Sequence, residues 1–114
     1  MLFKIKDISK QVVYEVQLDK DIALSSYEEQ IGYCVSKLYK EGKNLRYCDL
    51  ATAYLEDTNL EKIKLHSADA KLAHFINCNL TYANLVKANL SCANLTDSIF
   101  NSAFLDRDWE FYFL

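Results

Sequence analysis

The first eighteen residues alternate apolar and polar positions, which is the pattern of half-buried β-strands. Phe3 and Ile5 alternate with lysines, and a second alternation runs from Val12 through Tyr14 and Val16 to Leu18. Two such runs separated by a short polar segment predict a β-hairpin that turns through residues 7–10. We therefore expect one face of this hairpin to pack against the rest of the protein.

The pattern becomes helical after residue 25. Apolar residues follow at i, i+3, i+4, i+7 and i+8, namely Ile31, Cys34, Val35, Leu38 and Tyr39. Ser26 and Glu29 have the spacing of a capping box at the start of this run, and Gly42 suits its end. These signals predict an amphipathic helix with one apolar face.

From Lys43 onward the apolar positions recur every five residues, in thirteen units without an insertion. The third residue of each unit is Leu or Phe in twelve of the thirteen, and Ala70 is the exception. The first residue is mostly small, and the second is Asn or Asp in eight units. A period of five fits neither a helix nor a strand. It predicts a solenoid that turns a corner every five residues, with twenty residues in a four-sided coil.

In this interpretation the third residue fills the coil and the small first residue fits beside it, while the other three face solvent. Coils stacked at strand spacing, about 4.8 Å apart, give a little over three coils and a rise of about 15 Å. Ala70 leaves space where Leu is usual, and Ile63 occupies a slot for a small residue. Both fall in the same coil, so their volumes can compensate.

The repeat resembles the pentapeptide-repeat family, whose unit is A-(D/N)-L-x-x. The run ANLVKANLSCANLTD at 83–97 matches that unit throughout, and the resemblance extends over residues 43–107. It implies a mainly β fold, a right-handed quadrilateral parallel β-helix. The preceding hairpin and helix are similar to those of small phage and prophage members. The resulting division is an N-terminal cap at 1–42, the β-helix at 43–107 and a C-terminal segment at 108–114.

The C-terminal segment is rich in large apolar side chains: Trp109, Phe111, Tyr112, Phe113 and Leu114. Left in water, they would form a large apolar patch. They can fold under the last coil as a cap or join two chains end to end, as family members often do. Ile99 and Phe104, at outward positions of the last units, favour the homodimer.

Composition narrows the function classes. The 114 residues carry 16 acidic and 13 basic side chains, a net charge of −3, which disfavours direct nucleic-acid binding. No apolar run is long enough to span a membrane, and no secretory signal is apparent, so we expect a cytoplasmic protein. The four cysteines form no C-x-x-C pair, and neither His66 nor His74 has metal ligands at a fixed spacing. We expect no catalysis, metal or cofactor.

Charge is segregated among the four sides. One side carries Lys43, Arg46, Lys64, His66, Lys87 and Arg107. The carboxylates, which form the candidate partner-binding face, are Asp49, Glu56, Asp57, Asp69 and Asp97. Known family members mimic duplex DNA and compete for the DNA groove of type II topoisomerases. Other phage proteins use acidic surfaces against host nucleases such as CRISPR complexes.

Two functions follow for a non-catalytic binding protein. One is a DNA-mimic inhibitor of a bacterial DNA-handling protein, a topoisomerase or, in a phage, a counter-defence target. The alternative is a scaffold or docking module without mimicry, which binds through the basic side or an apolar patch at Leu72 and Ile76. Binding that weakens with salt and competes with DNA distinguishes the first from a hydrophobic docking face.

Overall fold

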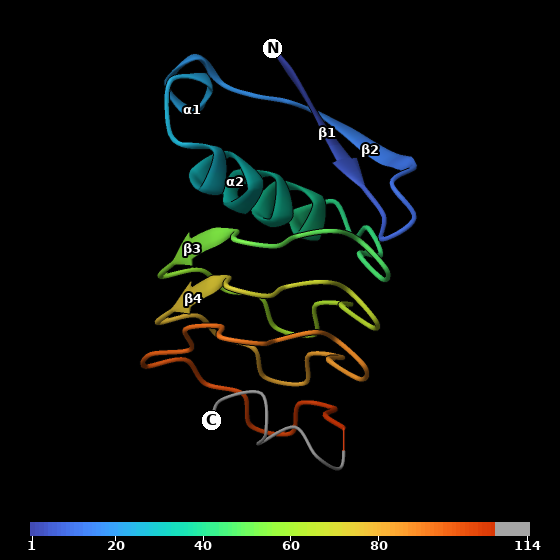
Figure 1. Cartoon of the computed structure of the whole chain (residues 1–114). Coiled ribbons are helices and arrows are strands. Elements are labelled where there is room, and N and C mark those ends of the chain that lie inside the picture. The colour runs from blue at the N-terminus through green and yellow to red at the C-terminus, as the bar shows by residue number, and fades with distance from the viewer. Residues whose placement is uncertain (107–114) are drawn as a thin grey trace.

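The structure, a computed structural model, describes residues 1–106 and begins with the predicted hairpin. Strands β1 (Leu2–Lys6) and β2 (Val12–Gln17) pair antiparallel (Figure 1). A β-bulge shifts the register after Ile5, so that Lys6 pairs with Val12. The expected face for Val12 was wrong for this reason, because a bulge reverses the alternation beyond it. The Val12 side chain is 46% exposed.

Two helices follow, a short α1 (Lys20–Ala23) that the sequence did not predict and α2 (Tyr27–Lys40) that it did. Ser26 is the N-cap of α2, and its hydroxyl oxygen accepts from the backbone N–H of Glu29 at 3.2 Å. The Glu29 carboxylate accepts from the Ser26 hydroxyl at 3.3 Å. Gly42, with φ +73°, follows the C-terminal end of the helix. The start and end of α2 are therefore set by the residues that the sequence analysis singled out.

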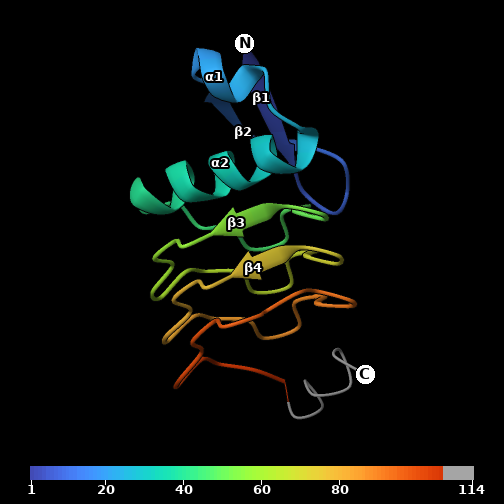
Figure 2. The same ribbon diagram turned by 90° about the vertical axis from the view of Figure 1, so that its left-hand side faces the viewer.

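Beyond α2 the chain forms a coil that returns to the same side every twenty residues (Figures 1 and 2). The N–H groups of Leu65 and Ser67 donate to carbonyl oxygens of the next coil, on Asn84 and Val86, both at 2.9 Å. The Asn84 N–H donates back to the Ile63 carbonyl oxygen at 2.9 Å. The same three bonds recur from side to side, so the coils are joined by parallel backbone ladders.

Every corner of the coil uses the fifth residue of a unit. All twelve residues at this position, from Tyr47 to Ser102, have φ between +51° and +67°. The next residue closes the turn, as where the Ala68 N–H donates to the Leu65 carbonyl oxygen at 3.0 Å. None of the twelve is glycine, the residue that usually supplies positive φ in a turn.

The preference for Asn or Asp at the second position has a direct cause. In all eight such units the side-chain Oδ1 accepts from the backbone N–H two residues later, at 3.0–3.2 Å. This bond is an Asx turn, which stabilises the corner. Where the second residue is Tyr54 or His74, the chain instead forms strand β3 (Tyr54–Glu56) or β4 (His74–Ile76). The two strands pair in parallel. The centroids of the Tyr54 and His74 rings lie 5.5 Å apart.

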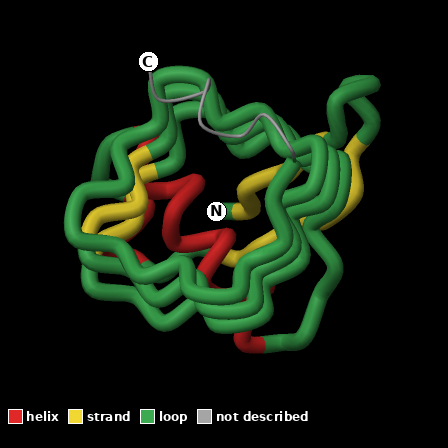
Figure 3. Tube along the Cα trace, turned by 90° about the horizontal axis from the view of Figure 1, so that it is seen from below, coloured by secondary structure: helices red, strands yellow, loops and turns green. Residues whose placement is uncertain are grey.

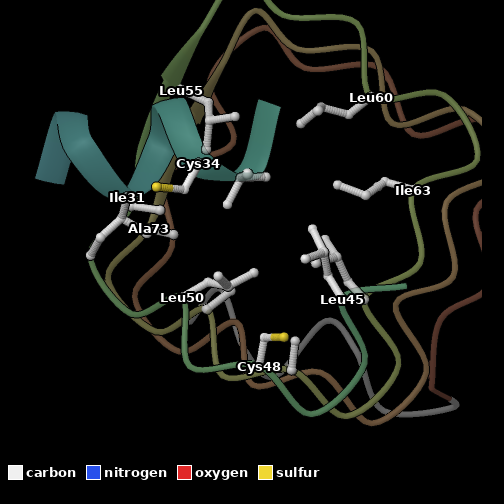
Figure 4. Close-up of a cluster of buried hydrophobic side chains, with 14 of the residues drawn as sticks. Ile31, Cys34, Leu45, Cys48, Leu50, Leu55, Leu60, Ile63 and Ala73 are labelled. Carbon is white, nitrogen blue, oxygen red and sulfur yellow. The ribbon is translucent and has the colours of Figure 1, made fainter. Parts of the chain in front are cut away.

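Figure 3 shows the stacked coils from below. Their interior is filled by the third and first residues of the units, several of which are drawn in Figure 4. Ala70 and Ile63 are both buried there. The core continues upward into α2 through Ile31 and Cys34, and into the hairpin through Ile5. The cap, α2 and the coil thus share one hydrophobic core. The right-handed sense remains a prediction from the family resemblance, and the number of coils remains a prediction from the length of the repeat.

Candidate functional site

The outward side chains of the coil form columns, because residues twenty apart stack on one side. Three exposed carboxylates, Glu56, Asp57 and Asp97, share one side, which we call the acidic face. The basic face lies two corners away and carries Lys43, Arg46, Lys64, His66 and Lys87 in the described part of the chain. Since two corners of a four-sided coil separate them, the two faces lie on opposite sides. Residues 43–107 contain seven acidic and seven basic residues, so charge is separated rather than in excess.

The acidic face is held by hydrogen bonds between side chains of the same side of the coil. Asp57 Oδ1 accepts from the Asn77 side-chain amide of the next coil at 2.7 Å. Glu56 Oε2 accepts from the Tyr54 hydroxyl at 3.0 Å, and this bond, with the negative charge of Glu56, raises the pKa of Tyr54. Glu29 of α2 contributes to the same rise in pKa, so α2 extends the negative potential of this face.

The structure separates two of the predicted carboxylates from this face. Asp49 and Asp69 stack on the adjoining side of the coil. Their Oδ1 atoms accept from the backbone N–H groups of Ala51 and Lys71, and so both residues stabilise their own corners. The second oxygen of Asp69 forms an ion pair with Lys71 Nζ at 3.8 Å. The three carboxylates of the acidic face have no ion-pair partner among residues 1–106.

The predicted apolar patch and dimer surface lie partly within the residues that the structure describes. Ile99 and Phe104 point outward, with 52% and 58% of their surface exposed, and Leu72 is 51% exposed. Ile76 is half-buried. The predicted dimer residues Trp109, Phe111, Tyr112, Phe113 and Leu114 lie outside the described residues.

The four cysteines differ in their exposure to solvent. Cys34, Cys48 and Cys78 are buried, and Cys92 is exposed at a corner with φ +57°. Burial raises the pKa of Cys34 and of Cys48 to about 11, and nearby Asp7 and Asp49 add to the rise at Cys48. These thiols therefore stay protonated at neutral pH. Among residues 1–106, no cluster of three or more His, Cys, Asp or Glu could hold a metal ion.

Sequence reasoning missed two contributors to the charged faces. Glu29 of α2 lines the same groove as Tyr54 and Glu56, and only the packing of α2 on β3 reveals this. Lys62 belongs to the neighbouring side, yet it lines the same groove as Arg46 and Lys64. The place of Lys62 could have been predicted from the repeat, because the fifth residue of a unit stands at the corner next to the following side.

The recurring bonds and corners make the repeat a structural unit, and the comparison with known families agrees. Residues 71–107 match the family described as pentapeptide repeats, in eight copies. These residues, about a third of the chain, are therefore pentapeptide repeats. No curated protein matches it significantly.

The coil begins before the matched segment. The Leu45 N–H already donates to the Lys64 carbonyl oxygen at 3.0 Å, in the pattern seen further along. The early units depart most from the family pattern, with Tyr54 and Lys64 at the second position and Ile63 at the first. No helix within residues 1–106 is both long and apolar enough to cross a membrane.

Proposed function

We propose that this pentapeptide-repeat protein is a non-catalytic binding module whose acidic face occupies the cationic DNA-binding cleft of a bacterial DNA-handling protein. One observation carries the proposal. Glu56, Asp57 and Asp97 are exposed on one side of a hydrogen-bonded coil and have no cationic partner among residues 1–106. Fixed, unpaired carboxylates are suited to meet the Lys and Arg side chains that a DNA-binding cleft presents.

The spacing of these groups supports the same function. Asp57 and Asp97 stand in one column two coils apart, roughly 10 Å at the spacing of adjacent strands. A right-handed quadrilateral coil would present them along a rigid edge. Candidate partners are a type II topoisomerase or, in a phage-infected cytoplasm, a defence nuclease such as a CRISPR complex. An end-to-end homodimer through Ile99, Phe104 and the C-terminal aromatic residues would double the length available to fill a groove.

The test is reversal of the acidic face by Glu56→Lys, Asp57→Lys and Asp97→Lys together. DNA supercoiling by a topoisomerase and DNA cleavage by a CRISPR nuclease are measured with each protein added. The unmodified protein should inhibit one of them, and the triple variant should not. A matched control, Glu15→Lys with Asp21→Lys and Glu28→Lys, changes net charge equally on exposed residues elsewhere and should still inhibit.

Equal inhibition by the two triple variants would remove the acidic face from the mechanism. Inhibition of neither enzyme by the unmodified protein would overturn DNA mimicry. The alternative is then a docking scaffold, which is favoured by the exposed Leu72 and the half-buried Ile76. Binding through that apolar patch would persist as salt rises, whereas binding through the acidic face would weaken.

A further inference from the structure

A groove of about 470 Å³ opens on the basic face, where its corner meets Lys62 of the neighbouring side. It is lined by Asn44, Arg46, Tyr47, Lys62, Lys64, His66 and Asn84. None of these residues is acidic, and each side chain carries an N–H or O–H group that can donate a hydrogen bond. The volume lies within the range of small-molecule sites.

The cations of this groove are not neutralised within residues 1–106, where Lys71–Asp69 is the sole ion pair. Arg46, Lys62 and Lys64 thus converge on one space without a carboxylate between them. Like charges held together raise the local potential, and an anion bound among them is favoured. The Oδ1 atom of Asn44 already accepts from the Arg46 backbone N–H at 3.0 Å, which leaves the NH₂ group of Asn44 as a donor.

Two aromatic rings stand beside these cations. Tyr47 is 44% exposed, and its ring meets His66 edge to face, with centroids 5.9 Å apart and planes at 72°. The Ser67 hydroxyl lies 3.0 Å from His66 Nδ1 and restrains that ring. An exposed aromatic ring next to phosphate-binding cations is an arrangement on which a nucleobase can stack.

The cations that line the groove lie in two coils, and in the described residues the basic face adds only Lys87 in the next coil. In the column of Arg46 and His66 the next residues are Val86 and Asp106, and the column of Lys64 continues with Asn84 and Phe104. A nucleic-acid strand needs a longer cationic track, and the chain as a whole carries a charge of −3. The ligand that fits is therefore short.

We propose that this groove binds a nucleoside polyphosphate. Its phosphates are held by Arg46, Lys62 and Lys64, and its base stacks on Tyr47. The site is independent of the acidic face, which lies on the opposite side of the coil, and it could bind its ligand whether or not that face mimics DNA.

Isothermal titration calorimetry of the full chain with ATP tests this site. Arg46→Ala combined with Lys64→Ala should weaken ATP binding at least about tenfold, because each removes a hydrogen-bond donor to a charged group. Lys20→Ala combined with Lys71→Ala removes the same charge away from the basic face and should leave the affinity unchanged. All four side chains are exposed, and thermal denaturation of each variant verifies that the coil is intact. No binding of millimolar ATP, or equal loss in both double variants, overturns the proposal.

Stacking of the base on Tyr47 is tested with the variant Tyr47→Ala and with inorganic triphosphate, which is a polyanion like ATP but has no base. Tyr47→Ala should weaken ATP binding several-fold and leave triphosphate binding unchanged. An identical effect on the two ligands would exclude stacking and overturn a nucleoside ligand. A thymidine oligonucleotide or a poly-glutamate peptide that binds more tightly than ATP would assign the groove to a nucleic acid or an acidic protein instead.

Discussion

Gly32 of helix α2 lies directly against the backbone of Tyr54 in strand β3. A Cβ atom built on Gly32 would stand 1.8 Å from the Tyr54 carbonyl oxygen and 2.7 Å from its carbonyl carbon. Neither atom belongs to a side chain that could rotate away. The absence of a side chain at residue 32 therefore sets how closely α2 can approach the first coil.

Gly32→Ala should destabilise the protein, although alanine is the better helix former by up to about 1 kcal/mol. The backbone must move to admit the methyl group, and such overpacking costs about 1–3 kcal/mol or more. Urea denaturation followed by circular dichroism measures the change. Gly42→Ala is the comparison, because a Cβ there meets no atom within 4 Å but φ is +73°. It should cost only about 1 kcal/mol, and a stabilising Gly32→Ala would contradict the close approach.

The roles of the first and third positions in the unit could be predicted from the sequence, because a small first residue and a large third residue fill the coil. The enrichment of Asn and Asp at the second position was visible in the sequence, but the local backbone hydrogen bond that these side chains accept was found only in the structure. The corners could not be predicted in this way. Leu72, Tyr82 and Lys87 adopt positive φ although none favours it. The bonds between coils impose this conformation, as where the Leu72 N–H donates to the Ser91 carbonyl oxygen at 2.9 Å.

The charged faces could be predicted only in outline. Counting by twenty places Glu56 and Arg46 on different sides, but it does not reveal that Asp69 stabilises its own corner or that Glu29 reaches Tyr54. These relationships depend on side-chain direction and on the packing of α2, which the repeat does not encode. The bulge at Ile5 is likewise a property of the paired strands.

The phase of the repeat is tested by two adjacent residues. Leu85, 4% exposed, fills the coil, and its neighbour Val86 is half-buried on the outside. Leu85→Ala should lower the free energy of unfolding by about 2–5 kcal/mol, as truncation of a buried leucine does. Val86→Ser should cost well under about 1 kcal/mol. Equal shifts in the denaturation midpoint would contradict the inward assignment of the third position.

The strain at the corners is tested by two exposed lysines. Lys87 stands at a fifth position with φ +59°, whereas Lys71 stands at a fourth position and does not have positive φ. Lys87→Gly should be neutral or stabilising by up to about 1 kcal/mol, because glycine adopts this conformation without a Cβ clash. Lys71→Gly should destabilise by about 0.5–1 kcal/mol through the added freedom of the unfolded chain. The reverse order in thermal denaturation would rule out corner strain.

Alkaline pH should destabilise the fold through the buried thiols. Burial raises the pKa of Cys34 and Cys48 from 9.0 to about 11. Between pH 9 and 11 the unfolded chain loses protons that the folded chain keeps. Stability is therefore fully present below pH 9 and falls as the pH rises toward 11, by up to about 1.4 kcal/mol per pH unit for each thiol. Urea midpoints measured across this range give the slope.

The matched variant for this slope is Cys34→Ala with Cys48→Ala. It should be less stable at pH 7, because two packed sulfur atoms are lost, but its stability should decline less steeply between pH 9 and 11. Parallel slopes for the unmodified protein and the double variant would show that other groups govern the alkaline transition.

The exposed apolar side chains around the last coil predict a dimer joined end to end. Ile99 and Phe104 each expose more than half of their surface, and five of the six residues from Trp109 to Leu114 are large and apolar. Burying one large apolar side chain contributes about 1.5–3 kcal/mol. In a two-fold dimer the same patch of both chains is buried, so each of these residues contributes to the interface from both chains.

Light scattering after size exclusion, at micromolar concentration, should give the full chain twice the monomer mass of 13.2 kDa. Truncation after Arg107 should yield a monomer, or an aggregate if the unpaired backbone edge of the last coil pairs with other chains. Ile99→Ser with Phe104→Ser keeps the whole chain and should shift the equilibrium toward monomer, because it removes apolar area from the patch. Val12→Ser with Val13→Ser removes exposed apolar side chains from the opposite end and should leave the mass unchanged. A mass of one chain for the unmodified protein would mean that the aromatic residues form no dimer contact, and the C-terminal segment would then have only the role of a cap.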